Sequence, residues 1–311
     1  MSSSDLYNTK TAFFLSAYQT LINRALPDSS SPDYIPTLVY QARAHIALND
    51  PAGAISLLPP NSENVALKAV SALARYVSAT ESSEQEPILE ELRDLAVEIE
   101  GDDVEGTEHD KLTVRVIAGT AFARAGEIEE ALETLGSETE DLEAVAVIVQ
   151  IYLSINRPDR AKKEFERAKN WAEDDVLLQL IESSIGLVAA RDGYSNANSF
   201  YTEQLANPSL SSTHILTARG VTRILRNEIP AAKSDLEESL ERQKGGDAET
   251  LAACVVAAGI DAKKSNEADE LWTRLSTEHP SHPLVVDVEQ KSRLFDELCS
   301  NFPVPPLAVA A

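Results

Sequence analysis

Two histidines near the C-terminal end, in the run His279-Pro-Ser-His282-Pro, are of a residue type that binds metal ions. A zinc site needs three or four ligands, and no third or fourth ligand follows at a spacing typical of such sites. The two prolines favour an extended turn of the backbone. We therefore interpret the run as a structural turn and predict no metal ligand in it.

An acidic run from Glu100 to Asp110 is the second place where the residue types suggest cation binding. It holds six carboxylates and two glycines, with no Lys or Arg among them. Its spacing does not match the calcium loop of an EF-hand. We predict a solvated loop here rather than a metal site.

Motifs for nucleophilic or nucleotide chemistry are absent from the sequence. It has no P-loop, no dinucleotide-binding glycine motif, no Gly-x-Ser-x-Gly and no His-Glu-x-x-His, and it has only five histidines. The two cysteines, Cys254 and Cys299, cannot build a disulfide framework or a four-thiolate site, and Cys254 lies in the apolar run 251–258. The sequence therefore predicts no catalytic residue, no cofactor and no enzyme activity.

The charge balance excludes further classes of protein. Lys and Arg number 27 against 51 Asp and Glu, which gives a formal net charge of −24 at pH 7. Binding to nucleic acid or to an anionic membrane needs clustered cations, so we expect neither nucleic acid nor direct membrane insertion. The apolar runs are far shorter than the ~20 residues that span a bilayer. We expect a soluble cytoplasmic chain, and its low aromatic content of 5% with only 12 Gly favours helices.

An internal repeat shows how these helices are organised. An alanine is followed four residues later by a large apolar residue, and successive alanines from Ala131 onward are 30 to 36 residues apart. This spacing brackets the 34-residue period of tetratricopeptide repeats, in which each unit is a pair of antiparallel helices. The pairs are Ala54–Leu58, Ala131–Leu135, Ala161–Phe165, Ala197–Tyr201, Ala232–Leu236 and Ala268–Trp272.

Small residues and prolines stand where such helix pairs need them. The alanine allows close approach of the second helix to the first, and Gly119 and Gly220 can serve the same contact from the first helix. Pro51, Pro158 and Pro230 precede the alanine by two or three residues, in the first turn of the second helix. The predicted fold is all-α, a right-handed superhelical solenoid of tetratricopeptide-like helix pairs.

The predicted domain organisation is a single α-solenoid over 1–311. Degenerate repeats occupy 5–100, with a helix over 12–25, a linker over 27–33 and one unit at 64–100. The acidic loop spans 101–110 and regular repeats span 111–283. A capping helix over 284–300 and an apolar, Pro-rich tail over 301–311 complete the chain.

The capping helix is expected to cover the last repeat. Val288, Leu294, Phe295 and Leu298 form its apolar side and would shield Trp272, because the end units of a repeat array fray unless they are covered. If the helix does not have this role, it is a free element for binding a partner.

The concave side of such an array is the candidate binding surface. The inward positions of each first helix lie fifteen, eleven and eight residues before the repeat alanine, and apart from Glu182 they are uncharged. We predict that they form a groove for an apolar segment of a partner protein; the alternative is that they only pack the interior of the superhelix. The groove residues are Val116, Thr120, Ala123, Ala146, Gln150, Leu153, Gly186, Ala189, Thr217, Val221, Ile224, Ala253, Ala257 and Ile260.

Both ends of the chain resemble one family. Residues 6–25 are similar to the opening of the epsilon subunit of coatomer; they read LYNTKTAFFLSAYQTLINRA. That family begins with an aromatic helix, a short turn and a second helix that contains Tyr-Gln and Ile-Asn. The run from His279 to Asp296, with its His-Pro turn and a helix that carries Phe-Asp, is similar to the end of that family. The likeness covers nearly the whole chain, and the chain departs from it in the acidic loop and the apolar tail.

The resemblance implies a role without catalysis. The family is a component of the vesicle coat that returns cargo from the Golgi to the endoplasmic reticulum, and its epsilon subunit binds and stabilises the C-terminal region of the alpha subunit. The protein would be cytoplasmic and peripheral on Golgi membranes and coated vesicles, through the other coat subunits. Two alternatives are a tetratricopeptide scaffold of another cytosolic complex and an enzyme hidden in a helical fold.

Overall fold

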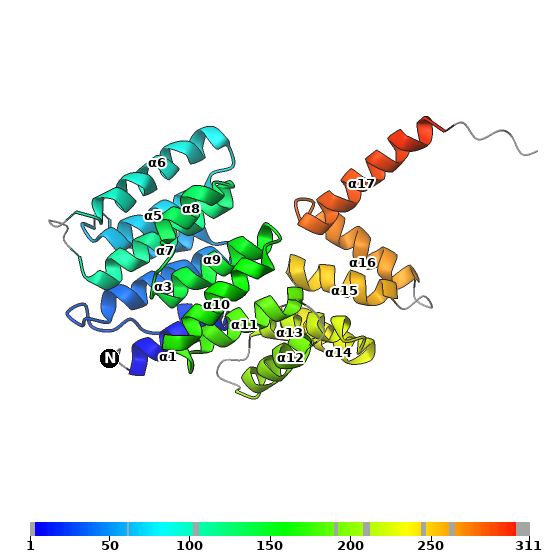
Figure 1. Cartoon of the computed structure of the whole chain (residues 1–311), viewed down its shortest axis with the longest axis horizontal. Helices are drawn as coiled ribbons and strands as arrows, with labels where there is room; N and C mark the ends of the chain where they lie inside the picture. Colours follow the sequence, from blue (N-terminus) through cyan, green and yellow to red (C-terminus); the bar gives the residue numbers. More distant parts are fainter. Residues whose placement is uncertain are drawn as a thin grey trace, which may run out of the picture. The chain divides into compact units, whose positions relative to one another are not determined.

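The computed structural model describes residues 4–60, 62–101, 106–189, 192–207, 212–243, 247–260 and 265–302. Within these residues the chain forms seventeen helices and no strand (Figure 1), so the all-α prediction is confirmed. The helices are α1 (Ser4–Phe14), α2 (Tyr18–Ile22), α3 (Tyr34–Ala47), α4 (Pro51–Leu57), α5 (Val65–Ser78), α6 (Ser82–Glu98), α7 (Glu108–Ala125), α8 (Ile128–Leu135), α9 (Leu142–Ser154), α10 (Pro158–Ala172), α11 (Val176–Ala189), α12 (Asp192–Leu205), α13 (Thr213–Leu225), α14 (Ile229–Arg242), α15 (Ala248–Ile260), α16 (Ser265–Glu278) and α17 (Pro283–Ser300).

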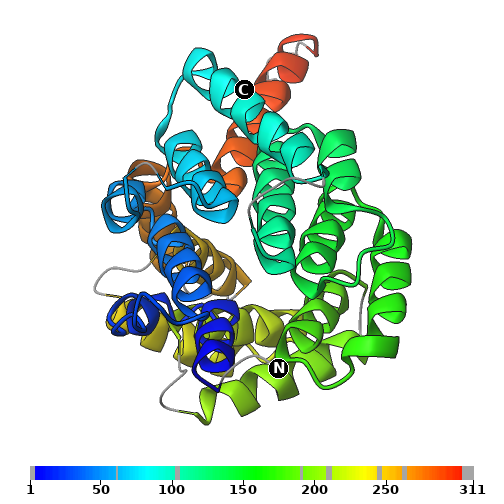
Figure 2. The same cartoon turned by 90° about the vertical axis from the view of Figure 1, so that its left-hand side faces the viewer.

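The chain divides into two compact units, residues 1–215 (unit 1) and 216–311 (unit 2). The boundary falls within α13 and not at the acidic loop, where the sequence pattern separated the degenerate from the regular repeats. In unit 1 successive helices follow one another around a curve, from blue through cyan to green in Figure 2, and α1 contacts both α3 and α11.

The repeat alanines lie at the helix crossings, as predicted. Ala54, Ala131, Ala161, Ala197 and Ala232 are fully buried, and Ala268 is half-buried. The two predicted glycines lie at close approaches: a Cβ on Gly119 would stand 2.5 Å from Cγ of Leu135 on α8, and one on Gly220 would stand 2.9 Å from Leu236 on α14. A side chain at either position would overlap its partner, which is why the first helix carries glycine there.

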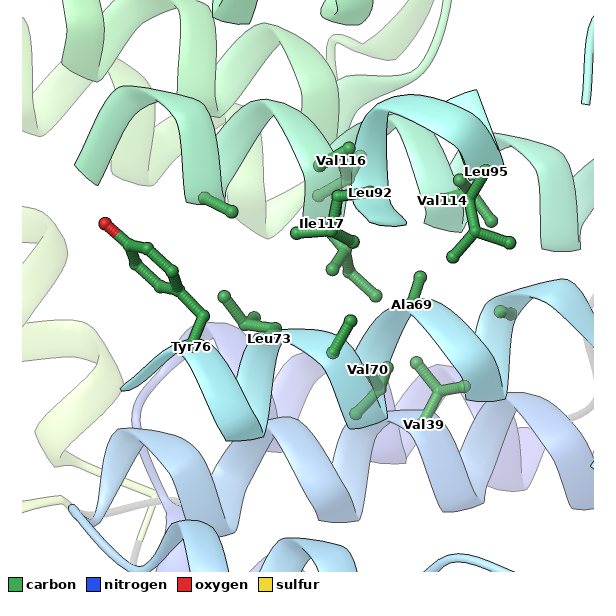
Figure 3. Packing of buried hydrophobic residues seen from close by; sticks show 14 of the residues in the cluster. Val39, Ala69, Val70, Leu73, Tyr76, Leu92, Leu95, Val114, Val116 and Ile117 are labelled. Atoms are coloured by element: carbon green, nitrogen blue, oxygen red, sulfur yellow. The ribbon is translucent and has the colours of Figure 1, made fainter. Parts of the chain in front are cut away.

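Unit 1 is held together by a continuous apolar cluster that spans several helix pairs. Figure 3 shows Ala69 and Leu73 of α5 on the side of Leu92 and Ile117, which belong to α6 and α7, and Val70 beside Val39 of α3. Each fully buried side chain of this size stabilises the fold by roughly 1.5–3 kcal/mol. Because the cluster runs from α3 to α9, the degenerate unit predicted at 64–100 is an integral part of the array.

Local signals place most helix ends where the sequence predicts them. Pro51 and Pro158 begin α4 and α10, and Pro230 is in the first turn of α14. The prediction of one helix over 12–25 is wrong, because the chain turns at Leu15–Ala17 and Ser16 has a positive φ of 57°. The acidic loop is also shorter than predicted.

At that loop, α7 begins at Glu108, where the Thr107 hydroxyl and the Asp110 carboxylate form a capping box. A capping box satisfies two backbone N–H groups that have no partner inside the helix, so it starts the helix there. Residues 102–105 of the predicted loop lie outside the described residues.

The last helix departs most from expectation. Only its first turn packs against the rest of unit 2, where Val285 is fully buried with Leu251 and Leu275. The residues expected to cover the last repeat, Val288, Leu294, Phe295 and Leu298, are all exposed. The capping prediction is therefore wrong beyond the first turn. Figure 1 shows α17 leaving α16 and continuing past it, and in the described residues of α17 only Val285 is buried. Residues 303–311 of the predicted tail lie outside the described residues.

Candidate partner-binding surface

The predicted groove residues do not share one environment. Five of the fourteen are buried inside their own unit and have no surface for a partner: Val116, Gly186, Thr217, Ala253 and Ala257. For these five residues the burial agrees with the alternative, that the inward positions only pack the interior.

Direct contacts explain each of these burials. Val116 belongs to the main cluster of unit 1, and Gly186 faces the backbone of Gly193 so closely that a Cβ would stand 2.9 Å from its carbonyl oxygen. The hydroxyl of Thr217 lies 2.7 Å from that of Thr250 and 3.0 Å from that of Ser239. Ala253 and Ala257 pack with Leu236 and Cys254, which confirms Cys254 as a buried apolar residue.

The other nine residues retain exposed area. The residue located eight positions before the repeat alanine is exposed or partly exposed in each of the five repeats. These residues occupy the last turn of each first helix: Ala123, Leu153 and Ala189 in unit 1, and Ile224 and Ile260 in unit 2. Ile260 is 51% exposed. Thr120, Ala146, Gln150 and Val221 lie further from the helix ends and keep partial or full exposure. The uncharged surface that remains is therefore at the C-terminal ends of the first helices.

In unit 1 the chain's own N-terminus packs against the same apolar cluster as part of the predicted groove. The cluster is formed by α9, α10 and α11, and Phe14 of α1 packs against it, as do the groove residues Ala146 and Leu153. The aromatic run at Phe13 and Phe14 was the signal in the sequence for this contact, since two adjacent large rings in an amphipathic helix need a surface to cover them.

A charged cluster fastens this N-terminal region to α9. Arg43 of α3 donates to Glu143 at the start of α9 with an N–O distance of 2.7 Å, although 100 residues separate them in the chain. Tyr40 donates its hydroxyl to the other oxygen of Glu143, and the Arg43 guanidinium lies 4.6 Å from the ring centre of Phe13. Both charged side chains are about 15% exposed or less, so each depends on the other for compensation.

Burial also shifts the acid–base behaviour of this cluster. At Asp141, burial followed by the negative charge of Glu143 raises the pKa to about 6. Burial also acts to raise the pKa of Glu143, but the charge of Arg43 and the hydrogen bonds from Tyr40 and Arg43 outweigh it, so that pKa is lowered. At His109, burial and the charge of Lys10 lower the pKa.

Shifted groups can mark a catalytic site, but here each carboxylate already serves the fold. Asp141 accepts the N–H of Glu143 as the N-cap of α9, and Glu143 accepts from Arg43 and Tyr40. Among the described residues, no group of three or more His, Cys, Asp or Glu side chains is placed to hold a metal ion. His282 acts as the N-cap of α17, where its Nδ1 accepts the N–H of Leu284. The arrangement supports the structural interpretation of His282.

A cleft of 1120 Å³ in unit 1 lies where α3, α5 and α7 begin. Its walls include Leu6, Ile35 and Pro36, with the polar side chains of Asn64 and Thr107. Asn64 and Thr107 accept N–H groups of their own helices, so their oxygens are already used. Glu63, His109 and Asp110 also line the cleft; Glu63 pairs with Lys68, and Asp110 belongs to the capping box of α7.

Comparison with solved structures supports the repeat fold. The chain resembles a tetratricopeptide repeat protein from Parabacteroides merdae with a TM-score of 0.54 and 12% sequence identity, over 81% of this chain and 96% of that one. At this identity the likeness shows the fold alone. No helix in the described part of the chain is long and apolar enough to cross a bilayer.

Comparison with known sequences shows the family. The chain is 26% identical to coatomer subunit epsilon of Caenorhabditis elegans over 95% of this chain and 98% of the relative, and 28% identical to coatomer subunit epsilon-1 of Arabidopsis thaliana over 96% and 97%. A probable coatomer subunit epsilon of Schizosaccharomyces pombe is 26% identical over 78% of this chain and 76% of the relative. The family model described as coatomer epsilon subunit matches residues 2–303, so the chain belongs to the coatomer epsilon subunit family.

Proposed function

We propose that this chain is a structural, non-enzymatic subunit of the coatomer vesicle coat that binds and stabilises the C-terminal region of the coat's alpha subunit. It acts in transport from the Golgi to the endoplasmic reticulum. It resides in the cytoplasm and reaches Golgi membranes and coated vesicles through the other coat subunits. The observation that carries the proposal is the family match over residues 2–303.

The distribution of charge supports binding to a protein rather than to a membrane. The formal net charge is −24, yet the exposed ends of the first helices present Ala123, Leu153, Ala189, Ile224 and Ile260 without a single charge among them. A strongly acidic chain is repelled by anionic lipid. Uncharged, partly apolar area surrounded by charge is the usual composition of the core of a protein–protein interface.

The proposal is tested by recovering partners from cytosol with the full chain and by calorimetry with the purified C-terminal region of the alpha subunit. Ile260→Glu is the informative variant, because Ile260 is 51% exposed and a carboxylate there does not disturb the core of the free protein. Val97→Glu, on α6 at 72% exposure, is its matched control. We expect Ile260→Glu to weaken binding at least tenfold and Val97→Glu to leave it unchanged.

A scaffold of another cytosolic complex is the alternative, and the likeness to a bacterial tetratricopeptide repeat protein is compatible with it. The same recovery experiment separates the two functions. Large coat subunits in the bound fraction support the coatomer role, and their absence in a preparation where the protein is folded contradicts it. Unchanged binding by Ile260→Glu rejects the helix-end surface but not the partner.

A further inference from the structure

A small cavity in unit 2 is left unfilled by the fold. It lies between α14, α15 and α16, which Figure 1 labels, and its volume is 80 Å³. Its inner walls are apolar, and its charged side chains come from α14 and α16. The residues that line this α14–α16 cavity are Lys233, Leu236, Glu237, Leu240, Cys254, Ala257, Glu267 and Leu271.

The short side chains of α15 account for the cavity. Cys254 and Ala257 are three positions apart and share one side of α15, where neither is long enough to fill the space between the leucines of α14 and α16. Ala257 and Leu236 are fully buried, whereas Leu240 and Leu271 remain partly exposed. The cavity is therefore closed towards α15 and open between α14 and α16.

The size and the walls of the cavity restrict what can fill it. A water molecule takes about 30 Å³ in the liquid, so 80 Å³ holds roughly three heavy atoms, the size of an isopropyl group. Small-molecule ligands occupy pockets of roughly 300–1,000 Å³, so the cavity is too small for a cofactor. Water is held poorly because it needs several polar partners and the inner walls offer only carbon and a thiol. A single aliphatic side chain is the occupant that fits.

The charges at the opening indicate which residue accompanies that side chain. Lys233 of α14 already pairs with Glu267 of α16 at 3.4 Å. Glu237 lines the cavity and is exposed, and it has no ion pair or hydrogen bond among the described residues. A cation of the partner can therefore pair with Glu237 without displacing Lys233.

The Cys254 thiol reports how close these carboxylates lie to the cavity. Burial, followed by the negative charges of Glu237 and Glu267, raises the pKa of this thiol to about 11. The thiol is therefore uncharged at neutral pH and serves as an apolar wall. A second copy of this chain is a poor source of the occupant, because each copy carries a net charge of −24 and the two repel each other.

We propose that the α14–α16 cavity receives one valine or leucine side chain of the alpha subunit, with a Lys or Arg beside it that pairs with Glu237. This inference rests on the proposed function, because it assigns a further contact to the same partner, separate from the surface at the ends of the first helices. Side chains that fill a dry pocket carry much of the binding free energy of an interface, and the contacts around them mainly exclude water.

The first test fills the cavity from within, in the full chain. Cys254→Leu places a branched aliphatic group in the cavity, and Cys254→Ala is the matched control, which also loses the thiol but leaves the cavity open. We expect Cys254→Leu to keep or raise the melting temperature, because filling a cavity commonly stabilises a protein. It should raise the Kd for the purified C-terminal region of the alpha subunit at least tenfold, and Cys254→Ala should change that Kd less than twofold.

The second test removes the charge at the opening. Glu237→Gln should raise the Kd severalfold and reduce its dependence on salt, because it removes the partner of the proposed cation. Asp269→Asn is its control: Asp269 is exposed on the side of α16 opposite to Leu271, so the variant removes the same charge away from the cavity. Equal effects of the two variants contradict the proposed ion pair.

The outcomes separate the inference from the function on which it rests. A wild-type chain that does not bind the alpha region contradicts the proposed function and the inference together. Normal wild-type binding that a folded Cys254→Leu variant retains contradicts the inference alone. A wild-type dimer in sedimentation that Cys254→Leu dissociates assigns the cavity to a second copy and overturns the proposal.

If Cys254→Leu melts below the wild type, labelling of the wild-type thiol decides instead. The rate at which methyl methanethiosulfonate modifies Cys254 is followed by mass spectrometry, which separates it from the exposed Cys299. Bound alpha region should slow this reaction at Cys254 at least tenfold, because the inserted side chain closes the cavity. An unchanged rate in the complex contradicts the inference.

Discussion

The two terminal helices carry similar aromatic residues, but these residues are packed in α1 and exposed in α17. In unit 1, Phe13 of α1 contacts Arg43 and Tyr40 of α3, and Phe14 packs against the apolar cluster of α9, α10 and α11. In unit 2, α17 leaves Phe295 66% exposed. The difference shows that an apolar helix at the end of a repeat array is covered only where the rest of its unit supplies a matching surface.

The N-terminal region contacts residues that are far away in the sequence, whereas α17 beyond its first turn does not. The N-terminal region has Glu143 as an anchor for Arg43 and an apolar cluster on α9 and α10 for Phe14. On α17 the ion pairs connect residues four positions apart on the same helix. They therefore stabilise the helix itself and make no contact with another helix. The first helix is therefore part of the fold, whereas the last is attached to it only at its first turn.

The largest expected effect comes from breaking the anchor of the N-terminal region. Arg43→Ala leaves Glu143 buried without its cation and should cost about 3–5 kcal/mol in the free energy of unfolding. Arg75→Ala, which removes a half-exposed pair with Glu91, should cost about 0–1 kcal/mol. Denaturant unfolding of both variants measures the difference, and equal losses would show that the buried cluster does not hold unit 1.

The two phenylalanines test the comparison directly. Phe14→Ala removes a half-buried ring and should cost about 2–3 kcal/mol, less than the full value for a core phenylalanine. Phe295→Ala should leave the melting temperature of the free chain unchanged, because its ring is in water. Thermal unfolding followed by circular dichroism gives both values. A comparable loss in Phe295→Ala would mean that α17 is packed in solution.

The helix crossings allow a matched pair of glycine substitutions. Gly119→Ala places a methyl group 2.5 Å from Leu135 and should destabilise the chain by about 1–2 kcal/mol. Gly259→Ala meets no atom within 4 Å and should be neutral or stabilising by up to ~1 kcal/mol, as expected for alanine in a helix. Opposite signs in calorimetric melting confirm the close approach of α7 and α8; two neutral substitutions contradict it.

The last expected effect, which appears only toward neutral pH, is a pH dependence at Asp141. Its folded-state pKa of about 6 exceeds the value of roughly 3.9 in an unfolded chain, so the native state holds the proton more tightly between these values. The stability contribution of this group is therefore present below pH ~4 and is lost as pH rises through 6. Asp141→Asn keeps the N-cap and removes the buried charge.

We expect Asp141→Asn to raise the free energy of unfolding by about 1–3 kcal/mol at pH 7.5 and to leave it nearly unchanged at pH 4. Asp50→Asn, at the exposed N-cap of α4, is the control and should show no gain at pH 7.5. If the free energy of unfolding depends on pH in the same way in Asp141→Asn and in the wild type between pH 4 and 7.5, Asp141 is not the group that titrates.

The amino-acid sequence by itself determined the helical pairs. The alanines from Ala54 to Ala232, the glycines Gly119 and Gly220 and the prolines at helix starts all predict features that the structure confirms. These features are predictable because each depends on local geometry: residues three to four positions apart share a helix side, and a crossing needs a small residue. Residues near both ends of the chain, 6–25 and 279–296, also indicated the family.

Only the tertiary structure decided which sides of the helices remain free. Val116 and Ala257 fit the groove pattern as well as Ile260 does, yet two are buried and one is exposed. Three features depend on which distant segments meet: the packing of Phe14 against the cluster of α9, α10 and α11, the pairing of Arg43 with Glu143 across 100 residues, and the exposure of Phe295. A periodic pattern shows that a residue lies on the apolar side of its helix, but what covers that side depends on which distant helix reaches it.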